Sequence, residues 1–165
     1  MSMAVLASAR HVARHEAHHA AALCLAGGLP EQVRIDWPDA STLGHVEVDW
    51  GDGPDRGKAR HVLVAILVGG MTDGLDGWES WPIDPDCVPA GARRDAKQAR
   101  HLAEYIGIAD RATWLFYVWK ANQLARRPEF RRLVVRIADE LERVEVLTAQ
   151  DLEGLIATTE ETWST

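Results

Sequence analysis

Residues 15–19 read His-Glu-Ala-His-His, so two histidines stand four positions apart and a glutamate directly follows the first. On a helix, His15 and His19 lie on the same face, where both imidazoles can bind one ion. Zinc prefers imidazole ligands, and a catalytic zinc site keeps three protein ligands plus a water molecule. Glu16 is rotated by roughly 100° from His15, so it can accept a proton from that water. The motif indicates a metal-dependent hydrolase; the alternative is an ordinary helix with solvated or buried histidines.

The motif leaves the third metal ligand open. The extended zinc-protease pattern has another histidine six residues after His19, but Leu25 stands there. Glu31 and Glu47 could serve in a thermolysin-like arrangement, although neither has a helical context. Glu47 lies on the polar face of an alternating run, as in a half-buried strand. The residues around the motif therefore leave several carboxylates as candidates.

Most of the elements that must position these residues are predicted to be helices. Helix periodicity and start and stop signals predict six of them, over residues 3–26, 58–75, 92–107, 110–127, 128–146 and from the capping box at 148–151 onward. Alternating apolar residues over 33–37 and 44–50, with turn residues between them, predict a small antiparallel hairpin. Residues 76–91 are rich in Trp, Pro and Asp and predict a loop. We expect a mainly helical fold with a small β-hairpin, in a single domain over residues 1–165.

Composition and charge exclude several classes of protein. With 47% hydrophobic and 26% charged residues, the chain is typical of a globular domain. Its net charge of −7 argues against nucleic acid or an anionic membrane as partner, because both need clustered Lys and Arg. Cys24 and Cys87 are too few for a disulfide framework. No signal peptide is evident, and the apolar run over 62–71 is about half the length of a bilayer span. We expect a soluble, cytoplasmic protein.

Five stretches along the chain occur in an order typical of one protein family. They are ARHEAHHAAA, TLGHVEVDW, VLVAILVGGMTDGL, GARRDAKQARHLA and LERVEVLTAQDLEGLI. From about residue 5 to residue 156 the chain thus resembles the peptidase domain of the FtsH family of ATP-dependent zinc proteases. The resemblance implies an FtsH-type zincin fold and one zinc ion held by His15, His19 and Asp95, with Glu16 as general base. It also implies that the strand after the Leu-Gly turn binds substrate. Asp95 also suits a helix start, where the dipole favours an acid, and both roles can hold together.

Three features depart from that family. His18 stands where the family usually has glycine. It could donate a hydrogen bond to a metal ligand, compete with the ligands for the metal, or be a partly exposed residue with no role in the site. The connection to Asp95 is longer than usual and carries Trp78 and Trp81, which could contact an apolar side chain of the substrate or pack the loop onto the core. We expect neither the ATPase module of the family, because the sequence has no phosphate-binding loop, nor its membrane anchor, because the longest apolar run is too short for a bilayer span.

The predicted function is zinc-dependent endopeptidase cleavage of extended or unfolded polypeptide, with Glu16 as general base on the zinc-bound water. Without an ATPase, such an enzyme could cut peptides, loops and unstructured tails, or chains that a separate partner delivers. The alternative is a catalytically retired, metal-stabilised binding module that recognises a protein partner through the same groove. Glu16 weighs against it, because a structural zinc site needs no base. A metallohydrolase of a non-peptide amide, and assembly into an oligomer, both stay open.

Overall fold

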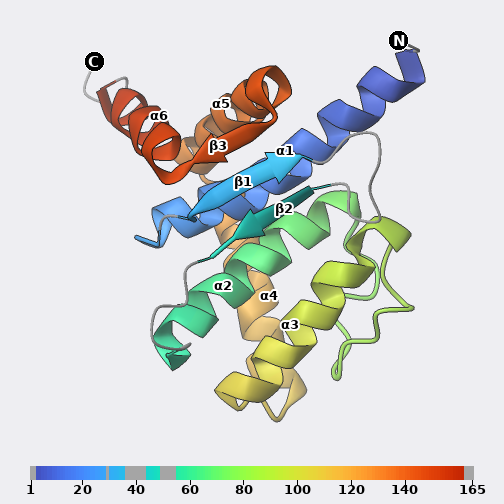
Figure 1. The fold of residues 1–165 in the computed structure, drawn as a ribbon. Helices are drawn as coiled ribbons and strands as arrows, with labels where there is room; N and C mark the ends of the chain where they lie inside the picture. Colours follow the sequence, from blue (N-terminus) through green and yellow to red (C-terminus); the bar gives the residue numbers. More distant parts are fainter. Residues whose placement is uncertain (1–2, 29, 36–43, 49–54, 162–165) are drawn as a thin grey trace. The chain divides into compact units, whose positions relative to one another are not determined.

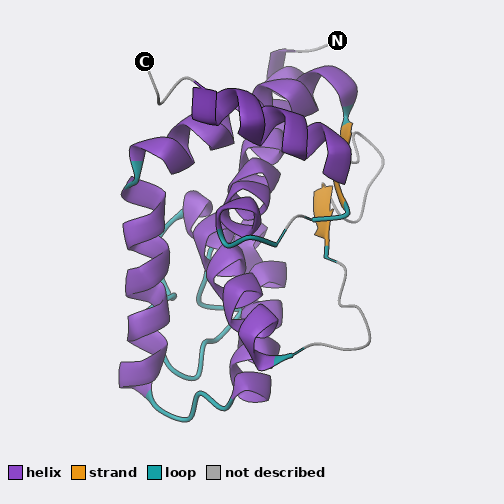
Figure 2. Cartoon of the chain, turned by 90° about the vertical axis from the view of Figure 1, so that its left-hand side faces the viewer, coloured by secondary structure: helices purple, strands orange, loops and turns teal. Residues whose placement is uncertain are grey.

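The computed structural model describes residues 3–28, 30–35, 44–48 and 55–161 (Figure 1). The chain divides into two compact units, one formed by Met1–Asp49 with Pro128–Thr165 and the other by Trp50–Arg127. Helices account for most of the described residues and three short strands for a small part (Figure 2). The expectation of a mainly helical fold with a small antiparallel sheet is confirmed.

The first unit combines three helices with a three-stranded antiparallel sheet. Its elements are α1 (Met3–Leu25), β1 (Gln32–Ile35), β2 (Gly44–Glu47), α5 (Pro128–Val144), β3 (Val146–Thr148) and α6 (Ala149–Glu161). The strand order is β2-β1-β3, and Val33 in the central strand is opposite Val46 on one side and Leu147 on the other. In Figure 1, α1 runs along one face of this sheet.

The core of the first unit forms around α1. Small side chains cover its buried face, and Ala13, Ala17 and Ala20 are fully buried. This face packs against α5, whose buried side chains are larger and include Phe130 and Ile137. Since alanine lets a neighbouring element approach closely, α1 also lies against β1 and β2. The predicted helix over 3–26 is confirmed as Met3–Leu25, and it contacts α5 and two strands of its unit.

The second unit is a helical unit built on α2. Its elements are α2 (Arg56–Gly70), two short 3-10 turns at Met71–Asp73 and Ala90–Ala92, α3 (Arg93–Ile106) and α4 (Arg111–Arg126). The C-terminal part of α2 is buried from Ala65 to Gly70 because the helix packs against both α3 and α4. Gly107 ends α3 with a left-handed φ of 85°, as helix C-termini commonly do.

Tryptophans hold the loop between Gly74 and Pro89 against α4. Trp78 is fully buried, and its carbonyl oxygen accepts a 2.7 Å hydrogen bond from the Trp114 indole nitrogen. The ring of Trp81 lies 5.2 Å from that of Trp114, measured between centroids. These contacts agree with the interpretation in which Trp78 and Trp81 pack the loop onto the core.

The third strand was not predicted from the sequence. The helix expected over 128–146 ends at Val144, where Glu145 has a φ of 65° and turns the chain. Val146–Thr148 then pairs with β1 instead of continuing the helix. The capping box is confirmed, since Thr148 N donates to Asp151 Oδ2 at 2.8 Å and Asp151 N donates to Thr148 Oγ1 at 3.4 Å.

The remaining helix predictions are confirmed to within a few residues, except that the helix expected over 58–75 gives way to a 3-10 turn after Gly70. The antiparallel pairing of the hairpin is also confirmed. Its turn at 38–42 and its ends at 36–37 and 49–50 lie outside the described residues. In the part of the chain that the structure describes, every helix is too short or too polar to cross a membrane.

We expect Asp110→Ala to lower the melting temperature by roughly 2–4 °C, because Asp110 caps the first turn of α4. Its carboxylate accepts hydrogen bonds from the backbone nitrogen and the hydroxyl of Thr113, at 2.8 and 2.7 Å. These bonds hold the pKa of Asp110 below its usual value. The stabilisation is therefore complete at neutral pH and is lost as the pH falls through the lowered pKa.

The measurement is thermal unfolding of both proteins at neutral and at acidic pH. Gln123→Ala is the matched control, because Gln123 is exposed in the last turn of the same helix, far from the cap. An equal loss at both pH values, or an equal effect of the control, would contradict the assignment of Asp110 as a charged cap.

Candidate metal centre

Helix α1 brings His15 and His19 together one turn apart. Their Nε2 atoms lie 3.1 Å from each other, and the ring planes meet at 76°. Two nitrogen ligands at zinc-binding distance from one tetrahedral ion would be about 3.3–3.4 Å apart. The two imidazoles therefore already converge as ligands of a single ion must, and the predicted histidine pair is placed as the helix periodicity requires.

Glu16 directly follows His15 on α1, a step of roughly 100° around the helix axis. Only 7% of its surface is exposed. Its side chain lies against the start of β2, where a Cβ atom added to Gly44 would be 2.7 Å from Glu16 Cγ. The carboxyl group is thus in a confined environment within the first unit, beside β2, one of the two end strands in the order β2-β1-β3.

Asp95 is in the first turn of α3, in the second unit, and is buried there. It lies against the end of α2, since a Cβ atom added to Gly70 would be 3.2 Å from Asp95 Cβ. The same Cβ atom would be 2.4 Å from a ring carbon of Trp78. Gly70 and the Trp78 ring therefore form the packing that supports Asp95.

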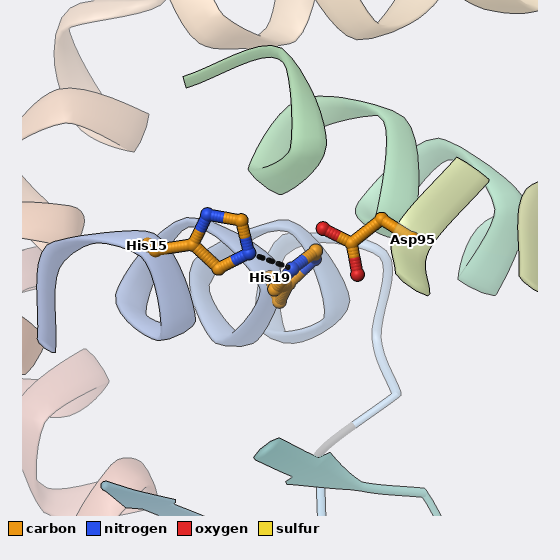
Figure 3. Close-up of side chains that lie close together, drawn as sticks. All are labelled: His15, His19 and Asp95. Atoms are coloured by element: carbon orange, nitrogen blue, oxygen red, sulfur yellow. Dashed lines mark hydrogen bonds between the residues drawn. The ribbon is translucent and has the colours of Figure 1, made fainter. Parts of the chain in front are cut away.

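His15, His19 and Asp95 form a group that could hold a metal ion, with one ligand atom of each within 4.8 Å of the others. Figure 3 shows the two imidazoles of α1 and the carboxylate of α3. Two imidazoles and one carboxylate are a donor set of catalytic zinc sites, and non-haem iron(II) uses the same set. Glu31 and Glu47, the other candidate third ligands, are not members of this group.

Two residues of this group, His19 and Asp95, are buried, and so is the neighbouring Glu16, whereas His15 is half-buried. Glu16, His19 and Asp95 are the charged or imidazole side chains that are buried among the residues the structure describes, each with 7% of its surface exposed. Taking a carboxylate out of water is costly unless it is paired or bound to a cation. A metal ion bound by His19 and Asp95 would help to offset this cost for those two side chains.

His18 lies elsewhere on α1 and packs against α5. Its Nδ1 donates a 2.6 Å hydrogen bond to the carbonyl oxygen of Arg14, and its ring lies 5.7 Å from that of Phe130. Burial lowers the pKa of His18 to about 4, so its ring is neutral at physiological pH. His18 does not belong to the metal-binding group. The structure places it as a packing residue.

Comparison with known proteins assigns neither a family nor a function to the chain. No protein-family model matches the chain, and no curated protein matches it. The chemistry of the site must therefore be argued from the residues themselves. Sequence reasoning missed Gly44 and Gly70, whose only signal was a glycine at a strand start and a glycine pair in a buried helix.

We expect Gly70→Ala to lower the free energy of unfolding by about 1–3 kcal/mol, because the new methyl group overlaps the Trp78 ring and crowds Asp95. Chemical denaturation measures this loss. Gly154→Ala is the matched control, because nothing lies within 4 Å of a Cβ atom there. In the middle of α6 it should be neutral or stabilise by up to about 1 kcal/mol. Equal effects of the two variants would contradict the close packing at Gly70.

Proposed function

We propose that the chain is a zinc-dependent endopeptidase that cleaves extended or unfolded polypeptide. The observation that carries the proposal is the ligand group of His15, His19 and Asp95, with the buried carboxyl group of Glu16 next to His15. A structural zinc site closes with four protein ligands and has no need for a buried base. The resemblance of the five stretches to the FtsH peptidase domain supports the same fold family, the same metal and the same reaction.

In the proposed reaction, three residues hold the metal ion and Glu16 transfers the proton. His15, His19 and Asp95 would hold the ion, which when bound supplies the Lewis acidity that activates water and polarises the scissile carbonyl. Glu16 accepts the proton of the attacking water and donates it to the departing nitrogen. Its burial keeps the carboxylate out of bulk water, which strengthens its interaction with that proton.

Strand β2 supplies a binding edge for the substrate. In the described residues it pairs with β1 on one side, at the end of the strand order β2-β1-β3. An extended peptide can add to such an edge through main-chain hydrogen bonds, which demand little of its sequence. Since β2 begins at Gly44, against Glu16, a peptide on this edge would pass beside the proposed base. Extended peptides and unstructured tails are the substrates that fit; a separate delivery partner would extend the range to folded proteins.

Glu16→Gln should retain zinc and lose peptide cleavage by a factor of about 10² to 10⁴, because the amide cannot accept the proton of water. Metal analysis and cleavage of an unfolded casein-like protein, with and without a chelator, measure the two properties. Cleavage by the variant at the wild-type rate would contradict the mechanism. A wild-type protein that binds zinc but cleaves nothing would favour the metal-stabilised binding module.

Asp95→Asn should weaken zinc binding by more than about 10- to 100-fold, the range known for residues that only support a ligand. Competition with a zinc chelator measures the affinity. Glu104→Gln is the matched control, because it removes an exposed carboxylate from the same helix. Unchanged affinity in Asp95→Asn would show that Asp95 is not a ligand.

A further inference from the structure

We propose that Gly44 is a positioning residue that sets the direction of the Glu16 side chain. A Cβ atom at position 44 would lie 2.7 Å from Glu16 Cγ and 2.9 Å from Glu16 Oε1. Side-chain carbons essentially never approach other heavy atoms this closely unless they are bonded to them. The space that any other residue would need is therefore occupied by Glu16. The catalytic meaning of this contact rests on the proposed function, whereas the contact itself does not.

Glu16 cannot avoid an added methyl group by a small movement. The closest atom is Cγ, whose position is fixed by the first side-chain torsion, χ1. Relief therefore requires another χ1 rotamer, and a helix strongly disfavours one of the three. A change of χ1 would carry the carboxylate several ångströms from its present place, about the reach of the side chain. The oxygen that has to accept the proton would move with it.

The strand cannot retreat either. Gly44 is opposite Ile35 in the register of β1, and the same added Cβ atom would be 3.0 Å from the carbonyl oxygen of Arg34. The strand is thus confined by β1 on one side and by α1 on the other, since α1 packs against both strands. A shift of β2 would disturb its pairing with β1. The residue that moves is therefore Glu16, because its side-chain torsions can change while the strand stays in place.

The first test is a pairwise comparison of stability. Gly44→Ala should lower the urea midpoint of unfolding, and in a Glu16→Ala background at least half of that shift should disappear. The reason is that Cγ and Oε1 are then absent and only the contact with the Arg34 carbonyl remains. Gly28→Ala is the control, because its Cβ atom would meet one backbone oxygen at an ordinary 3.9 Å. Equal shifts in both backgrounds, or no shift in either, would overturn the proposal.

The second test separates positioning from a loss of structure. At a temperature where the zinc-loaded Gly44→Ala protein is fully folded, kcat for peptide cleavage should fall by at least about 100-fold, because a misplacement of only about 1 Å already costs that much. KM should change by less than about twofold, because the main-chain edge of β2 is intact. An unchanged kcat would overturn the positioning role while the proposed function stands. If the wild-type protein cleaves nothing, the proposed function fails, and the urea comparison still decides whether Gly44 directs Glu16.

Discussion

The packing of α1 is the constraint on which the proposed site depends. This helix carries His15, Glu16 and His19, and it packs against α5 and against the strands β1 and β2. Its alanine-rich face lets these neighbours approach until the helix can neither rotate nor slide. The direction of each polar side chain is then fixed by its position along the helix. A looser helix would keep the same five residues but would lose the 3.1 Å convergence of the two imidazoles.

Buried polar groups explain why this helix is more than a core element. The described part of the chain places Glu16, His19 and Asp95 out of water, against the free-energy cost of desolvating them. A divalent cation would lower this cost for His19 and Asp95, because it attracts the carboxylate and the imidazole lone pair. If the group binds a metal ion, binding also stabilises the fold, because the folded state holds the ligands together and the unfolded chain does not. Glu16 is different, since it is buried but does not belong to the metal-binding group.

Close contact with a glycine is a feature that both halves of the site share. Gly44 leaves room for Glu16 in the first unit, and Gly70 leaves room for Trp78 beside Asp95 in the second. Neither glycine is needed for a left-handed turn, since Gly70 has an ordinary helical φ of −59° and Gly44 begins a strand. Their function is steric, and each lies in contact with a polar residue that the sequence marks as chemically important. Rigid support of this kind is what holds a reactive group within a fraction of an ångström.

The sequence alone determined the properties that depend on local order. Helix periodicity, the capping box and the alternation in the hairpin are set by neighbours within a few positions, and so the helices and the His15–His19 pair could be predicted. The third strand could not be predicted, because residues 146–148 pair with β1, more than a hundred positions away in the chain. For the same reason Asp95 could be chosen over Glu31 and Glu47 only through a family resemblance, and the sequence left open whether His18 and Trp78 pack against other parts of the chain. Tertiary packing decides which side chains meet and which glycines leave them space. The physical reason is that contacts between distant segments depend on the whole chain and leave no periodic signal in the sequence.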